Sequence, residues 1–170
     1  GLVESKASAA GKSLSATTRV ARDLAKSLTG SIEGAAAVTT AAQELGYTDT
    51  EPLERMSRLM VEMSAATGSS GPAMAAGLQQ MARSFGQLPE PRYIESLSDA
   101  VVTMSAKWGG SADQVAGFAA NIAPFAEAVG MSETAVIGLS TQFSRMGETG
   151  FRSATAINKV MADIERSLRE

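Results

Sequence analysis

The sequence feature that most constrains the fold is a series of glycine corners that recur about every twenty residues. The glycines at these corners are Gly46, Gly68, Gly86, Gly109, Gly130 and Gly147. Glycine adopts positive φ readily where a helix ends. Two corners then supply a serine, Ser111 or Ser132, of the kind that caps the next helix. The corners therefore predict a run of short helices, each ended by a glycine.

Apolar residues between the corners recur at intervals of three and four, which is the spacing of one helix face. The last three segments show it in Val115, Phe118, Ile122, Phe125 and Val129, in Val136, Leu139, Phe143 and Met146, and in Ile157, Val160, Met161, Ile164 and Leu168. No segment alternates apolar and polar residues over the length of a strand. We therefore predict an all-α fold, a multi-helix array of short helices of about 15–20 residues joined by Gly/Ser corners.

Composition favours helix packing and excludes most catalytic chemistry. Apolar residues make up 44% of the chain and aromatic residues only 5%, so the core must be built mainly from Ala, Leu, Val, Met and Ile. The chain has no cysteine and no histidine, which rules out disulfides, thiolate metal sites and most general-base or triad chemistry. We predict that the chain is not an enzyme and holds no cofactor or metal.

Charge and hydropathy limit the partners. The formal net charge is -3, which argues against stable nucleic-acid binding, because that affinity comes from Lys and Arg at the phosphates. No apolar run approaches the ~20 residues that cross a bilayer, so we predict no transmembrane segment. The chain starts without Met and stops within a helical pattern, so we expect it to be an excerpt of a longer protein.

Several short motifs resemble reactive sites but lack the context that such sites need. Gly11-Lys12-Ser13 has the end of a phosphate-binding loop without its first glycine or a preceding strand. Ser105 and Lys107 are two residues apart, so they lie on different faces of a helix. Carboxylate pairs such as Glu90 with Glu95, or Asp99 with Glu127, have no reason in the sequence to meet.

The first thirty residues carry a different pattern, a seam of period 3.5 that is typical of coiled coils. Its positions are Val3, Ala7, Ala10, Leu14, Thr17, Ala21, Leu24 and Leu28. We predict a longer N-terminal coiled-coil-like helix that associates with other copies of the chain, with a trimer as one form. The predicted domains are 1–30 for this helix, 31–50 for a short Ala-rich helix and linker, and 51–170 for a helical core domain.

The sharpest apolar stripe has two interpretations. Leu53, Met56, Leu59, Met60 and Met63 share one face of a helix that is rich in methionine. Such a stripe is most often part of a core, but Met-rich surfaces also form adaptable binding grooves. The alternative function is therefore a bacterial helical adaptor or effector-like protein-binding domain with a Met-rich groove.

The order of these segments resembles a known family. The residues that carry the resemblance are Ala66-Thr67-Gly68, the corner from Ser105 to Gly109 with Ser111, the run from Ala128 to Glu133, Met146-Gly147, and Phe151 to Ala154. From about Leu53 to Leu168 their succession is similar to the core region of tail tape measure proteins of long-tailed bacteriophages and prophages.

The resemblance implies a structural protein of the virion. Proteins of that family lie in the lumen of the tail tube, help to set tail length during assembly in the host cytoplasm, and are released during genome ejection. The partners that it implies are tail tube or tail tip proteins and other copies of the chain. It implies no catalytic residue.

Overall fold

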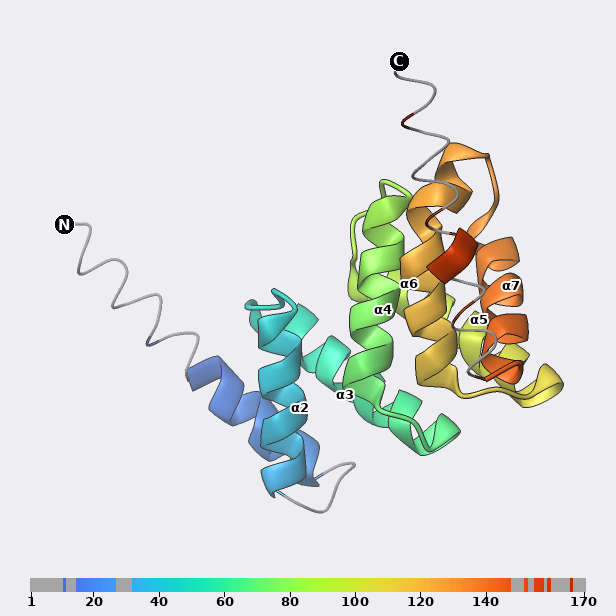
Figure 1. The fold of residues 1–170 in the computed structure, drawn as a ribbon. Coiled ribbons are helices and arrows are strands. Elements are labelled where there is room, and N and C mark those ends of the chain that lie inside the picture. Colours follow the sequence, from blue (N-terminus) through green and yellow to red (C-terminus); the bar gives the residue numbers. More distant parts are fainter. Residues whose placement is uncertain are drawn as a thin grey trace. The chain divides into compact units, whose positions relative to one another are not determined.

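The structure, a computed structural model, describes residue 11, residues 15–26, residues 32–147 and the isolated positions 152, 155–157, 159 and 166. Across these residues the chain forms helices and no strand (Figure 1), which confirms the all-α prediction. Residues 15–26 are helical, and the remainder of the predicted N-terminal helix lies outside the described residues.

Six further helices follow in order. They are α2 (Ile32–Glu44), α3 (Thr50–Thr67), α4 (Gly71–Ser84), α5 (Pro91–Trp108), α6 (Ala112–Ala128) and α7 (Glu133–Arg145). Their lengths run from 13 to 18 residues, so α2, α4 and α7 are slightly shorter than expected. The starts of α3 and α5 agree with the prolines, since Pro52 lies in the first turn of α3 and Pro91 begins α5.

All six predicted corner glycines have positive φ: Gly46, Gly68, Gly86, Gly109, Gly130 and Gly147. The corner after α6 shows how such a residue ends a helix. Gly130 has φ of 75°, and the next N–H, of Met131, donates to the Ala126 carbonyl at 2.8 Å. That hydrogen bond satisfies a carbonyl that would otherwise have no partner in the helix.

The predicted serine caps are partly confirmed. Ser132 precedes α7, and its hydroxyl accepts the N–H of Ala135 at 3.2 Å, as a capping residue does. Ser111 stands at the same position before α6 but makes no such bond. Its hydroxyl instead donates to the carboxylate of Asp113. The prediction that the Ser111 side chain caps α6 was therefore wrong, because the N–H of Gln114, three residues later, donates to the Asp113 carboxylate instead of to the Ser111 hydroxyl.

The chain divides into two compact units, Gly1–Glu62 and Met63–Glu170, with the boundary inside α3. In the first unit Leu24, Ala25 and Ala35 form a buried cluster, and Val38 and Val61 pack against it. This cluster joins the helical residues 15–26 to α2 and to the part of α3 that belongs to the first unit. The predicted division at residues 30 and 50 stays a prediction.

In the second unit α4 to α7 form an up-and-down bundle. A contact of 3.5 Å between the hydroxyls of Ser69 and Ser111 joins the starts of α4 and α6. The starts of α5 and α7 are joined by the Tyr93 hydroxyl, which donates to Glu133 at 2.6 Å. Because short corners reverse the chain between these pairs, α4 and α6 run one way and α5 and α7 the other. We call the two ends of the bundle the Ser111 end and the Tyr93 end.

α6 is the central helix of this bundle and packs against α4, α7 and α5 (Figure 1). Most of its buried side chains are small, since alanines provide more than half of them. On the α7 side the rings of Phe118 and Phe143 meet edge to face, with centroids 6.1 Å apart. On the α4 side a β-carbon at Gly77 would lie only 2.8 Å from the carbonyl oxygen of Ala116. The two backbones are therefore in direct contact, which only glycine at residue 77 permits.

Four buried hydroxyl groups are satisfied within their own helices. They belong to Thr39, Ser57, Ser140 and Thr141. Each donates to the backbone carbonyl four residues earlier, at 2.7–2.8 Å. An unpaired buried hydroxyl would cost about 1–3 kcal/mol, so these bonds allow polar side chains inside an apolar core.

Candidate functional site

The short motifs that resemble reactive sites do not assemble into one in the part of the chain that the structure describes. No group of three or more acidic side chains there is arranged to hold a metal ion. The Ser105 hydroxyl is buried without a hydrogen-bond partner. The ammonium group of Lys107 lies instead over the ring of Trp108, 5.1 Å from its centroid. Ser105 and Lys107 therefore form no dyad.

The Met-rich stripe is part of the core. Leu53, Met56, Leu59, Met60 and Met63 are all buried, and Met56 and Met60 have no exposed surface. A groove that binds a partner helix would leave these side chains open. The structure therefore favours the core interpretation of this stripe over the binding groove.

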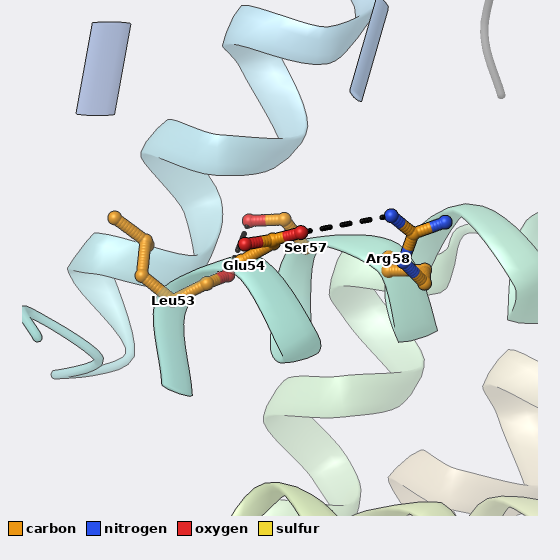
Figure 2. A network of polar contacts seen from close by, with 4 residues as sticks. All are labelled: Leu53, Glu54, Ser57 and Arg58. Carbon is orange, nitrogen blue, oxygen red and sulfur yellow. Dashed lines mark hydrogen bonds and ion pairs between the residues drawn. The ribbon is translucent and has the colours of Figure 1, made fainter. Parts of the chain in front are cut away.

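The outer face of α3 carries charges that pair along the helix. Figure 2 shows Glu54 and Arg58, whose nearest charged atoms are 3.7 Å apart, beside the buried hydroxyl of Ser57. Glu51 and Arg55 form the same kind of pair at the same distance. Each pair spans one helical turn and is largely exposed, so each contributes about 0.3–0.5 kcal/mol. This face is a solvated helix surface.

A polar cluster holds the Ser111 end together. The N–H of Ser111 donates to the Ser144 hydroxyl at 2.9 Å, and this hydroxyl donates to Gln114 at 3.2 Å. Asp113 accepts the Ser111 hydroxyl and the N–H of Gln114. Ser69 adds a contact from the corner before α4. The cluster therefore links three segments of the bundle: the corner before α4, the start of α6 and the end of α7.

Hydrogen bonding lowers the pKa of Asp113. The Ser111 hydroxyl is the main cause; the N–H of Gln114 and the Ser69 hydroxyl act in the same direction and burial opposes them. A lowered pKa in the fold means that the charged form stabilises it. That contribution is complete above the ordinary value of 3.8 and is lost as the pH falls through the lower folded value.

We expect Asp113→Asn to lower the stability of the chain by about 1 kcal/mol at pH 7, because the amide accepts these hydrogen bonds without the charge. The difference from the wild-type chain should shrink as the pH falls below about 4. Urea unfolding at several pH values measures it. Asp99→Asn, at an exposed site on α5, is the matched control and should change stability by less than about 0.5 kcal/mol. Equal effects of both substitutions at every pH would contradict a stabilising role of the charged Asp113 side chain.

The opposite end of the bundle is tied by Tyr93 and Glu133. Burial raises the pKa of Tyr93 to about 12, and the hydrogen bond to Glu133 and its negative charge add to the effect. Because the folded pKa is raised, the contribution of Tyr93 to stability is complete below pH 10 and is lost between pH 10 and about 12.

The chain has two tyrosines, so Tyr47→Phe leaves Tyr93 as the only phenol. In this variant we expect phenolate absorbance to appear with a midpoint near 12 rather than 10 while circular dichroism still reports folded helices. Adding Glu133→Gln should move the midpoint only part of the way back, since burial is the larger cause. A midpoint near 10 in the folded Tyr47→Phe chain would show that Tyr93 is solvated.

The predicted self-association seam is only partly within the described residues. Val3, Ala7, Ala10, Leu14 and Leu28 lie outside them. Ala21 and Leu24 are described, and both are buried. Leu24 packs with Ala25 and Ala35 of the same chain. The seam stays a prediction, and at Leu24 it would compete with a contact that the single chain already makes.

Within the described ranges, five large apolar side chains are exposed. Leu88 is 74% exposed, Val129 55%, Trp108 and Met146 50%, and Leu139 36%. Val129, Leu139 and Met146 continue the apolar spacing of the sequence without joining the core. Val129 and Met146 follow the last residues of α6 and α7, where the chain turns away from the buried face. Leu139 lies on the outer side of α7.

These features define a class: the described part of the chain is a helical protein in which glycine corners join short helices around an apolar core. A family model described as phage-related minor tail protein matches residues 7–169, and the chain belongs to this family. It is therefore a structural protein of the phage tail, and its place is in the virion. No curated protein and no solved structure matches the chain. None of the helices in the described ranges has the length and hydropathy to cross a membrane.

Sequence reasoning missed the polar ties of the bundle. Ser144 reads as one more polar residue near a helix end, and Tyr93 as a residue of the first turn of α5. Their partners lie 33 and 40 residues away in sequence. Gly77 carried a weak signal, because a glycine inside a helix that is otherwise rich in alanine and methionine lowers helix propensity and is compatible with a close packing contact.

Proposed function

We propose that the chain is the core region of a tail tape measure protein. The observation that carries the proposal is the match of nearly the whole chain to a phage tail family, joined to the ordered residues that resemble tape measure proteins. In this role the chain lies in the lumen of the tail tube, helps to set tail length during assembly, and leaves during genome ejection. Tail tube or tail tip proteins are its partners.

The bundle suggests where along such a protein this segment belongs. A continuous helix adds about 1.5 Å per residue, so the residues from Gly71 to Arg145 would span about 110 Å as a rod. Folded back, they reach only the length of the longest helix, α5, which is about 27 Å for 18 residues. A folded-back bundle measures length poorly. We therefore place it near one end of the tape measure, as an anchoring domain.

Mass spectrometry of purified virions tests the role. The protein should be present in full particles and depleted from tails that have ejected their genome. Tail tube subunits of the same particles serve as the reference for sample loss. Equal amounts before and after ejection would contradict release, and absence from full particles would contradict a place in the tail.

Deleting residues 63–147 from the full-length protein tests the position. If the bundle anchors one end, electron microscopy should show few or no complete tails. Tails that assemble normally and are shorter by about 130 Å, the length of 85 residues as a continuous helix, would indicate instead that the segment measures length as a rod.

The N-terminal seam belongs to the same proposal. We propose that it joins copies of the chain as a coiled coil, with a trimer as one form, that continues from domain 1–30 into the rest of the tape measure. Light scattering after size exclusion should then give a multiple of the 17.5 kDa chain mass. Leu14→Lys should shift it to the monomer, because a charge at a seam position opposes packing. A strict monomer in both cases would contradict the seam.

A further inference from the structure

Four of the five exposed large apolar residues in the described part of the bundle lie at its two ends, and the fifth, Leu139, lies on the side of α7. Trp108 is the last residue of α5, and Met146 directly follows the last residue of α7. Both therefore belong to the Ser111 end. Leu88 lies in the corner after α4 and Val129 follows α6, so both belong to the Tyr93 end. Exposed apolar surface costs free energy in water, and each end has two such side chains at least half exposed.

The charges of the Ser111 end are mainly positive. Lys107 and Arg145 are exposed there, and Lys107 lies over the ring of Trp108. Of the described residues at this end only Asp113 is negative, and its carboxylate is engaged by the Ser111 hydroxyl and the N–H of Gln114. The end therefore offers an aromatic ring and a methionine beside two cations.

The charges of the Tyr93 end are mainly negative. Its carboxylates are Glu90, Glu95, Glu127 and Glu133, and its cations are Arg83 and Arg92. Glu90 and Glu127 are exposed and lie within two residues of Leu88 and Val129. The end therefore offers two aliphatic side chains beside an excess of carboxylates, which complements the opposite end in charge.

We propose that copies of this chain associate end to end, with the Ser111 end of one bundle against the Tyr93 end of the next. In this contact Trp108 and Met146 cover Leu88 and Val129, while Lys107 and Arg145 face Glu90 and Glu127. The contact is heterologous, so a dimer keeps one free end on each copy and can add further copies, as an open chain or, where the rotation closes, as a ring. It is independent of the N-terminal seam and holds whether or not the tape measure assignment does.

The contact is small, so the association is weak and depends on salt. Ion pairs at an exposed rim are screened within about 8 Å at physiological ionic strength. We expect the mean mass in sedimentation equilibrium to rise with concentration at low salt, and the association to weaken about tenfold as salt is raised to 0.5 M. Trp108→Ala should weaken it at least about tenfold, since buried aromatic residues dominate such contacts.

Charge exchange between two variants tests the pairing. In the first variant Glu90→Lys and Glu127→Lys reverse the Tyr93 end. In the second, Lys107→Glu and Arg145→Glu reverse the Ser111 end. Both variants also carry Leu14→Lys, which removes the proposed seam, so each alone should stay monomeric because both of its ends then carry the same sign. Mixed one to one, the two should form a heterodimer about as tight as the wild-type contact. Circular dichroism confirms that both variants are folded.

Cross-linking tests the direction of the contact. The chain has no cysteine, so single cysteines can be placed without background. Ala106→Cys marks the Ser111 end, Gln87→Cys marks the Tyr93 end, and Gln80→Cys on the exposed side of α4 is the control. With a short bis-maleimide, only a mixture of the two end variants should give a dimer in high yield.

Three results would overturn the proposal. One is a chain that stays monomeric at low salt and millimolar concentration. Another is cross-linking of Gln87→Cys with itself, or of Gln80→Cys as efficiently as of the end pair. The third is association that survives Trp108→Ala and both charge reversals but is lost in Leu14→Lys, which would assign self-association to the seam alone.

Discussion

Gly77→Ala is expected to destabilise the bundle by about 1–3 kcal/mol, although alanine is the better helix former. The added β-carbon would lie 2.8 Å from the carbonyl oxygen and 3.2 Å from the β-carbon of Ala116, so α4 and α6 would have to move apart. This contact is between two rigid helix backbones, and neither has a flexible side chain that can yield. Gly77→Leu should lower the stability further, because the rest of its side chain would extend from the β-carbon into the backbone of Ala116.

Gly117→Ala is the matched control for Gly77→Ala. It lies on α6, next to Ala116, and a β-carbon there meets nothing within 4 Å. We expect a gain of about 0.5–1 kcal/mol from helix propensity alone. Urea unfolding followed by circular dichroism measures both variants. A stabilised Gly77→Ala chain would show that α4 and α6 are not in backbone contact.

Leu78→Ala should destabilise the chain by about 2–5 kcal/mol, the largest effect that we expect from a single truncation. Leu78 lies on α4 one residue after Gly77 and has no exposed surface. The substitution removes three carbon atoms, Cγ and the two Cδ methyl groups, and leaves a cavity that the close α4–α6 contact prevents from collapsing.

The control for Leu78→Ala is the same substitution at Leu88, which is 74% exposed. We expect it to change stability by less than about 0.5 kcal/mol. Thermal and urea unfolding should therefore separate the two variants clearly. Leu88→Ala would still weaken the proposed end-to-end contact, so its effects on folding and on association are distinguishable. Equal losses of stability at Leu78 and Leu88 would contradict the burial that the structure shows.

The sequence predicted the features that depend on local chemistry. Glycine at a helix C-terminus adopts positive φ because it lacks a β-carbon, so Gly46 or Gly130 could be recognised from their surroundings. The burial of Met56 and Met60 followed from their spacing on one helix face. These two patterns were sufficient to predict the all-α fold class.

The features that the sequence did not reveal depend on tertiary contacts. Ser111 has the right type and position for a cap, but its hydroxyl donates to Asp113 and its backbone N–H donates to Ser144 of another helix. Val129 and Met146 continue an apolar pattern whose helix has already ended. The two ends of the bundle, and hence the complementary surfaces proposed here, appear only once the directions of the helices are known.

The hydroxyl groups of Thr39, Ser57, Ser140 and Thr141 bear on how these units respond to force. Each is bonded within its own turn of helix, so drawing neighbouring helices apart breaks none of these four bonds. Resistance at these positions comes from short-range apolar contact, which is lost within a few ångströms of displacement. Under tension the helices can therefore part as intact rods and come together again without exchanging these hydrogen-bond partners.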